Sequence, residues 1–247
     1  MAFKRRDKNL FDPASPKPFK LSRSRLENFI KCPRCFYLDR RLGIDRPSMP
    51  GFTLNSAVDA LLKKEFDVYR AKGEPHPLMK AHGVDAVPFQ HSDLDIWRAN
   101  FKGLTYHHHP TNLIITGAID DLWVTPANQL IVVDYKATSK DGEVSLDDDW
   151  KDSYKRQMEI YQWILRGMGY DVQDTGYFVY ANGRKDLDRF DSTLNFNIQL
   201  LPYAGHAGWV EPAIIDAHRC LTANTIPEAH LDCEFCEYRR LMREVEG

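Results

Sequence analysis

One stretch of this sequence, Leu130-Ile131-Val132-Val133-Asp134-Tyr135-Lys136, limits the possible folds more than any other. Four consecutive apolar residues indicate a strand covered on both faces, because a strand with one solvated face would alternate with polar residues. Asp134 and Lys136 then follow at positions i and i+2, so both side chains lie on the same face of the strand. Burying an acid and a base there costs free energy unless a function or compensating partners offset the cost.

A second acid follows another apolar run. Residues 113–119 predict a strand that leads to Asp120, and a turn at 126–128 separates it from the strand at 130–133. If the two strands form a hairpin, Asp120 and Asp134 converge. Two carboxylates beside a lysine can hold Mg²⁺ or Mn²⁺, which lowers the pKa of a bound water, while the lysine orients that water. The alternative is a buried Asp–Lys ion pair with Asp120 in the adjacent turn, and the strand pair alone does not decide between them.

The remaining periodicities predict one mixed α/β domain, with a central mixed sheet flanked by helices. Helices are expected at residues 22–38, with a break at Pro33, and at 53–69, 92–101, 151–168 and 208–222. Further strands are expected at 175–181 and 190–200. The apolar stripe of the helix at 53–69 comprises Leu54, Ala57, Val58, Leu61, Leu62, Phe66 and Tyr69. Residues 1–20, with three prolines, are expected to form a flexible basic arm, and residues 21–247 a single domain.

Composition excludes several classes of protein. With 43% hydrophobic and 28% charged residues among 247, the chain is neither disordered nor fibrous. It contains no apolar run near the ~20 residues that a membrane span needs. The basic start, Met1-Ala2-Phe3-Lys4-Arg5-Arg6, is not followed by the apolar stretch of a signal peptide. We therefore expect a cytoplasmic protein that does not bind membranes.

The net charge of −2 conceals a division along the chain. Residues 1–46 contain thirteen Lys and Arg against five Asp and Glu, a net charge of +8, whereas the remainder carries −10. A basic first segment on an acidic body indicates a surface for a polyanion and an acidic cluster for a cation. The candidates for phosphate contacts are Lys20, Arg23, Arg25, Lys31 and Arg34.

Four of the five cysteines form two Cys-x-x-Cys pairs, Cys32/Cys35 and Cys233/Cys236. In a cytosolic protein such pairs more often bind metal than form disulfides. Two such pairs are the commonest arrangement for structural zinc. Cys220 lies on the apolar stripe of its helix and is expected in the core.

Three short motifs in order carry a family resemblance. They are Gly117-Ala118-Ile119-Asp120, then Asp134-Tyr135-Lys136, then Gln157-x-x-x-Tyr161 on the following helix. This order resembles the RecB-like branch of the PD-(D/E)XK nucleases, which includes the nuclease domains of RecB and AddB and the CRISPR-associated spacer-processing exonucleases. The resemblance runs from about residue 22 to 242 and implies a restriction-endonuclease-like core.

The resemblance assigns roles to individual residues. It implies Asp120 and Asp134 as ligands of Mg²⁺ or Mn²⁺, Lys136 as the catalytic lysine, and the Tyr135 carbonyl as a further ligand. Gln157 and Tyr161 would line the site and position nucleic acid, although a glutamine there could also simply satisfy a backbone group. Such nucleases commonly add a histidine from the early helix, where this chain has Asp59. Asp59 is therefore a weaker third ligand, and the His107–His109 run is a further candidate.

In some members of this branch, one cysteine before the domain and three after it hold a four-iron–four-sulfur cluster. Cys32, Cys233 and Cys236 match three of these positions, the last expected cysteine is absent, and Cys35 supplies a fourth thiolate from the other segment. Zinc and iron–sulfur both accept four thiolates, so the spacing leaves the group undecided.

The function expected from the whole sequence is that of a metal-dependent DNA nuclease. It would hydrolyse phosphodiester bonds in an exonuclease-like manner, in DNA repair, recombination or mobile-element processing. The expected partners are single-stranded DNA or duplex ends, and a helicase or recombination protein. The alternative is a catalytically inactive nucleic-acid-binding or assembly subunit that retains the fold. Asp59, in place of the family's histidine, slightly favours the inactive subunit. The retained Asp-x-Lys motif disfavours it more strongly.

Overall fold

The computed structural model describes residues 5–47, 51, 53–148 and 151–246. The chain forms two compact units, each assembled from segments that are distant in sequence. The first comprises Met1–Pro50, His107–Thr116 and Gly208–Gly247, and the second comprises Gly51–Tyr106 and Gly117–Ala207. A single domain over residues 21–247 therefore stays a prediction.

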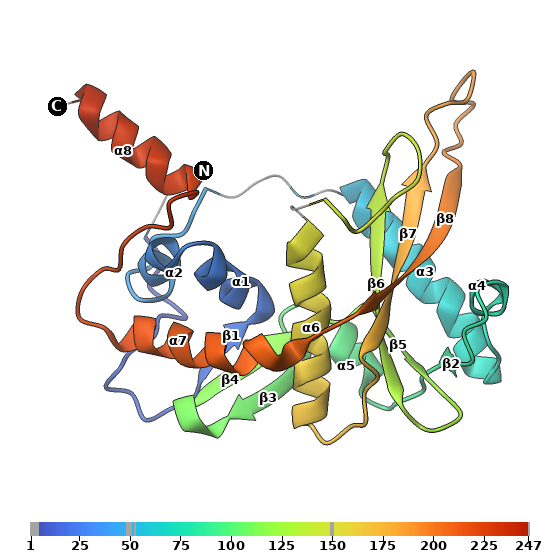
Figure 1. Ribbon diagram of the computed structural model, residues 1–247, viewed down its shortest axis with the longest axis horizontal. Coiled ribbons are helices and arrows are strands. Elements are labelled where there is room, and N and C mark those ends of the chain that lie inside the picture. The colour runs from blue at the N-terminus through green and yellow to red at the C-terminus, as the bar shows by residue number, and fades with distance from the viewer. Residues whose placement is uncertain (1–4, 48–50, 52, 149–150, 247) are drawn as a thin grey trace. The chain divides into compact units, whose positions relative to one another are not determined.

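The second unit is built on a five-stranded mixed sheet (Figure 1). Its strand order is β2 (Val87–Pro88), β5 (Asp121–Val124), β6 (Leu130–Thr138), β7 (Thr175–Gly183) and β8 (Phe196–Ala204). The β6–β7 pair is parallel, and the other pairs are antiparallel. The connection from β6 to β7 includes α6 (Asp152–Gly167), as a parallel pair requires a crossover. The central, apolar strand is β6, as its sequence predicts.

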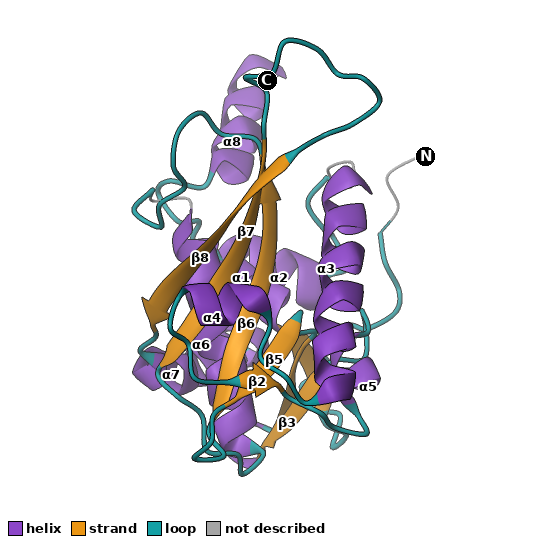
Figure 2. Cartoon of the chain, turned by 90° about the vertical axis from the view of Figure 1, so that its right-hand side faces the viewer, coloured by secondary structure: helices purple, strands orange, loops and turns teal. Residues whose placement is uncertain are grey.

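Helices cover both faces of β6. On one face, Ile131, Val133 and Tyr135 pack in a core cluster with Leu62 and Phe66 of α3 (Thr53–Lys72), which runs alongside the sheet in Figure 2. On the other face, the alternate residues Asp134 and Lys136 contact α6. Short helices α4 (Pro77–Ala81) and α5 (Leu94–Arg98) complete this unit. The strand therefore presents its apolar side chains to α3 and its acid and base to α6.

The first unit consists mainly of helices. Its elements are β1 (Phe19–Ser22), α1 (Arg23–Lys31), α2 (Pro33–Arg40), α7 (Val210–Thr222) and α8 (Glu234–Glu246). The helix predicted over residues 22–38 breaks at Cys32, where Pro33 begins α2. Part of the predicted arm packs within this unit, because the Phe11 side chain is buried and its N–H donates to the Arg40 carbonyl.

A second, three-stranded sheet has the order β1, β4 (Leu113–Gly117), β3 (Leu104–His108), with β1 and β4 parallel. Single 3₁₀ turns lie at His109–Thr111 and Ala207–Trp209. The mixed α/β class with sheets flanked by helices is thus confirmed. None of the described helices is long and apolar enough to cross a membrane.

Two details of the sequence prediction are wrong. The hairpin partner of β6 is β5 rather than the strand at 113–119, because that run ends as β4 in the other sheet and Ile119-Asp120 leads into a separate strand. The apolar stripe of α3 is also narrower than predicted, with Leu54 and Leu61 60% and 63% exposed. Only the line through Leu62, Phe66 and Arg70 is buried, because β6 and β2 contact one side of the helix.

Candidate active site

Asp120 lies directly before β5 and faces the middle of β6. The antiparallel register pairs Asp121 with Val133, so Asp120 comes beside the Asp134-Tyr135 peptide. The Tyr135 N–H donates to Asp120 Oδ2 at 2.9 Å. The structure therefore brings Asp120 next to the Asp-x-Lys segment, through β5 instead of the expected strand. The contact of the Tyr135 main chain with Asp120 is made by its N–H group. A metal-ligand role for the Tyr135 carbonyl stays a prediction.

Asp134 and Lys136 form an ion pair on the α6 side of β6. The Asp134 side chain is fully buried and that of Lys136 is 15% exposed. Gln157 Nε2 donates to Asp134 Oδ1 at 2.7 Å and contacts the Tyr161 hydroxyl at 3.2 Å. The predicted set of Asp134, Lys136, Gln157 and Tyr161 is thus brought together. Tyr154, which the sequence analysis did not select, adds its ring 4.5 Å from Lys136 Nζ.

The charges of this cluster stabilise one another. Burial opposes ionisation of Asp120, but Lys63 and Lys136 outweigh it and hold the pKa of that carboxyl below its usual value. Burial likewise disfavours the Lys136 ammonium, yet Asp134 and Asp120 raise its pKa above the usual value. Asp120 and Lys136 are therefore both charged at neutral pH, a state suited to binding a cation and a phosphate side by side.

Gly117, the first residue of the Gly-h-h-Asp motif, is required by close packing. A Cβ at this position would overlap the ring of Tyr161. The Tyr161 hydroxyl donates to the Ala118 carbonyl at 2.6 Å, which holds the segment before Asp120 against α6. The glycine and the tyrosine of the two motifs are thus direct neighbours, and the contact positions Asp120.

Asp59 points toward Asp120 with a lysine between them. Lys63, one turn after Asp59 on α3, lies 2.9 Å from Asp59 Oδ2 and 3.2 Å from Asp120 Oδ1. Burial and the nearby Asp120 raise the pKa of Asp59, although Lys63 acts in the opposite direction. Lys63 was missed by the sequence analysis. The available signal was its i+4 spacing from Asp59, which places both on one helix face.

Asp121, next to Asp120, has a different environment. Its fully buried carboxylate accepts hydrogen bonds from Arg70 at 2.5 Å, Arg98 at 2.7 Å and the Tyr135 hydroxyl at 2.7 Å. Both arginines also pair with Asp67. A carboxylate whose hydrogen-bonding capacity is filled in this way belongs to a structural network. The sequence alone does not show that Asp121 has this role and Asp120 does not.

The oxygen donors of the cluster fit a hard divalent cation. Asp59 Oδ1 is buried and receives no hydrogen bond from the described residues, and Asp120 lies close enough to perturb it. Mg²⁺ is usually held by one or two carboxylates with waters completing its shell, so a compact cage of three protein ligands is not needed. Of the residues that the structure describes, only the cysteines form such a cage.

The four predicted cysteines meet within the first unit. Their Sγ atoms all lie within 4.8 Å of one another, from Cys32, Cys35, Cys233 and Cys236. Each pair stands at the start of a helix, α2 or α8, where backbone N–H groups favour thiolates. Burial opposes ionisation of Cys32, but the amides of Cys35 and His230 lower its pKa to about 7. Cys220, predicted to lie in the core, is only half-buried and lies outside this group.

The basic residues predicted to contact phosphate and the His107–His109 run belong to neither the carboxylate–lysine cluster nor the cysteine cluster. Arg25, 27% exposed, pairs with Asp39 at 2.8 Å and Asp45 at 2.9 Å, whereas Lys20 and Lys31 are exposed, and Lys31 also lies 3.6 Å from Glu27. His107 and His108 contact Asn112 and Thr111 within the first unit.

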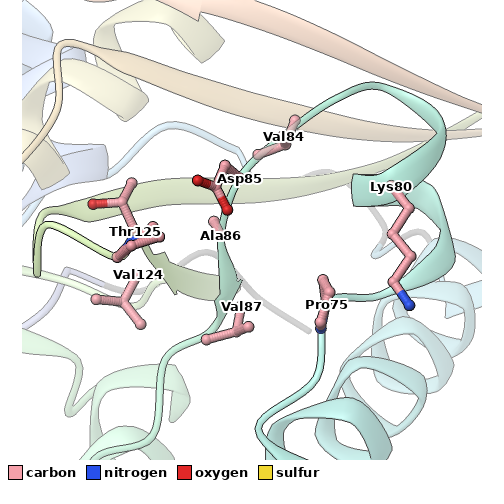
Figure 3. A pocket seen from close by; sticks show the side chains of 9 residues that line it. Pro75, Lys80, Val84, Asp85, Ala86, Val87, Val124 and Thr125 are labelled. Atoms are coloured by element: carbon pink, nitrogen blue, oxygen red, sulfur yellow. The ribbon is translucent and has the colours of Figure 1, made fainter.

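A surface pocket of about 480 Å³ shares no residue with the carboxylate–lysine cluster (Figure 3). Its lining is mostly aliphatic, with Lys80 and Asp85 among it. It offers no group of carboxylates to a cation.

Comparison with known proteins identifies the family. The chain matches the family model of the PD-(D/E)XK nuclease superfamily over residues 20–241 and belongs to that superfamily. Membership implies a metal-dependent, nuclease-like function, a divalent metal and a nucleic-acid substrate. A solved structure described as "Crystal structure of SSO0001" is 14% identical, with 90% of this chain and 84% of that chain covered and a TM-score of 0.35. No curated protein matches the chain.

Proposed function

We propose that this protein is a metal-dependent DNA nuclease of the RecB-like branch that acts on DNA ends. The observation that carries the proposal is the convergence of Asp120, Asp134 and Lys136, with Gln157 donating to Asp134. Its setting would be DNA repair, recombination or mobile-element processing in the cytoplasm, with a helicase or recombination protein as partner. The order of the three sequence motifs supports this branch.

In the proposed reaction each side chain has a separate task. Asp120 and Asp134, with Asp59 as a weaker third ligand, would hold Mg²⁺ or Mn²⁺, which supplies charge neutralisation at the phosphate and acidifies water. Lys136 orients the attacking water and stabilises negative charge on the phosphate oxygens. Gln157 fixes the carboxylate of Asp134, and Tyr161 fixes the peptide before Asp120. The exposed basic residues Lys20 and Lys31 are candidates for DNA backbone contacts.

The direct test is cleavage of end-labelled DNA with controlled metal. We expect Mg²⁺ or Mn²⁺ to support degradation of linear single-stranded or duplex DNA, and a chelator to abolish it. Covalently closed circular DNA of the same sequence is the matched substrate control, and its survival would identify an exonuclease. Absence of cleavage on every substrate with either metal would contradict the proposal.

One observation favours a second candidate function, an inactive DNA-binding subunit. The Lys63 ammonium lies between Asp59 and Asp120, where it supplies the positive charge that a cation would otherwise bring. If wild-type protein binds DNA without cleaving it under both metals, this candidate replaces the first.

Lys63 also gives a prediction about metal affinity. Replacing it by methionine removes the ammonium that competes for Asp59 and Asp120, so we expect Lys63→Met to bind Mg²⁺ or Mn²⁺ about tenfold more tightly, equivalent to ~1.4 kcal/mol. Titration calorimetry and the rise in melting temperature on adding metal measure this without any activity assay. Lys64→Met, an exposed neighbour, is the control. Equal metal affinity in the Lys63 and Lys64 variants would show that Lys63 does not compete.

A further inference from the structure

We infer that the four cysteines bind a single tetrahedral ion, zinc, and that a four-iron–four-sulfur cluster does not fit them. The inference concerns Cys32, Cys35, Cys233 and Cys236 of the first unit and does not depend on the proposed nuclease activity. It follows from the sulfur–sulfur distances, the arrangement of the donors along the chain and the charges around them.

The distances match one ion. Cys35 Sγ lies 3.6 Å from Cys233 Sγ and 3.5 Å from Cys236 Sγ, and Cys32 Sγ lies 3.8 Å from Cys236 Sγ. Four thiolates around a tetrahedral zinc, each at ~2.3 Å, stand ~3.8 Å apart at the edges of the tetrahedron. In a cubane cluster each thiolate binds a different iron at a separate corner, so the four sulfurs stand well farther apart. The observed spacing leaves room for one ion between the sulfurs and none for a cubane.

The donors are also arranged in two equal pairs. Cys32 and Cys35 flank the first turn of α2, and Phe36 N–H donates to the Cys32 carbonyl at 3.1 Å. In the same way, Cys236 N–H donates to the Cys233 carbonyl at 2.9 Å at the start of α8. Each pair is therefore one tight turn that aims two sulfurs at a common point. An ion at that point completes two short chelates, the usual construction of a structural zinc site.

The surroundings offset the excess negative charge. Four thiolates on Zn²⁺ carry a net charge of −2. Arg46 Nη2 lies 3.8 Å from Cys233 Sγ, and its guanidinium stacks 4.7 Å from the Phe235 ring. The N-termini of α2 and α8 add partial positive charge. Arg46 thus positions the thiolates and reduces their mutual repulsion.

The ion would fasten the end of the chain. Cys35 and Cys233 are 198 residues apart in sequence. No residue of α8 is buried. At its start, Cys233 and the partly buried Cys236 pack against Cys32 and Cys35, so little other apolar burial holds this helix. Closing a loop of that length restricts the unfolded chain, and the metal therefore stabilises the folded first unit.

Elemental analysis tests the inference. The full chain is purified anaerobically, from cells supplied with both zinc and iron, to protect any cluster. We expect one zinc per chain, no iron and no broad absorption band near ~400 nm. Brown protein with about four irons per chain would overturn the inference, and so would protein that contains neither metal and binds no added zinc.

Variants identify the ligands. Cys35 is the decisive position, because a cluster held by one early and three late cysteines would not use it. We expect Cys35→Ser and Cys236→Ser to lose at least tenfold in zinc affinity and to become sensitive to proteolysis near α8, whereas Cys220→Ser keeps its zinc. Retention of metal by Cys35→Ser would contradict the assignment. If a serine variant does not fold, zinc release from wild-type protein by a thiol reagent, at four thiols per ion, is the second measurement.

Discussion

We expect Asp134→Asn to lower the proposed metal-dependent DNA cleavage by at least about 100-fold, the order of loss when a preorganised charge is removed from a reacting centre. Asparagine keeps the shape of the side chain and an oxygen that can accept from Gln157. It removes the charge that pairs with Lys136 and that would bind the cation. Lys136→Met should cause a loss of the same order, since it removes the ammonium proposed to orient the attacking water and to stabilise negative charge on the phosphate oxygens.

A double variant separates catalysis from folding. Removing one member of a buried pair leaves the other charge uncompensated, whereas removing both can be nearly neutral for stability. Asp134→Asn combined with Lys136→Met should therefore be inactive but fold, as judged by circular dichroism and thermal melting. The exposed pair Asp141 and Lys185, 3.0 Å apart in the same unit, gives the matched control with the same two substitutions. Substantial cleavage by the double variant would remove both residues from the mechanism.

Asp121→Ala destabilises the protein by about 3–5 kcal/mol, the cost of breaking a buried ion pair by removing one partner. Arg70 and Arg98, each with a side chain 8% exposed, would lose the carboxylate that accepts from both. The Tyr135 hydroxyl would lose its acceptor as well. In a chain of this size such a change lowers the melting temperature by about 10 °C.

Asp120→Ala is the internal control for this prediction. Asp120 is partly exposed and its loss leaves Lys63 with Asp59 as a partner. We expect Asp120→Ala to lower the melting temperature less than Asp121→Ala, because its main structural loss is the acceptor of the Tyr135 N–H, and to lose DNA cleavage. The measurements are thermal or denaturant unfolding and the cleavage assay, made on both variants. A melting temperature of Asp121→Ala equal to that of the wild type would show that the arginine network contributes little to stability.

Much of the fold could be predicted because its signals are local. A run of four apolar residues bounded by turn residues indicates a covered strand, and the i, i+2 rule for a strand then places Asp134 and Lys136 on one face. Glycine and tyrosine of the two flanking motifs were visible as residue types, but their direct contact was not. The wrong choice of residues 113–119 as the hairpin partner of β6 has the same cause, because strand pairing is a contact that residue types do not show. Leu113–Ile115 and Leu122–Val124 are both apolar runs, and only strand pairing assigns them to different sheets.

From the sequence alone, three features could be predicted: the mixed α/β class, the placement of Asp134 and Lys136 on one face of β6, and the two Cys-x-x-Cys pairs. Residue type and spacings of two, three or four positions decide these features locally. Tertiary structure alone decided which of two adjacent aspartates faces Lys63 and which is enclosed by Arg70 and Arg98. It also decided the distances between sulfurs that are about 200 residues apart. These properties depend on which segments of the chain lie beside each other in space. The separation of two segments in sequence does not show whether they are neighbours in the fold.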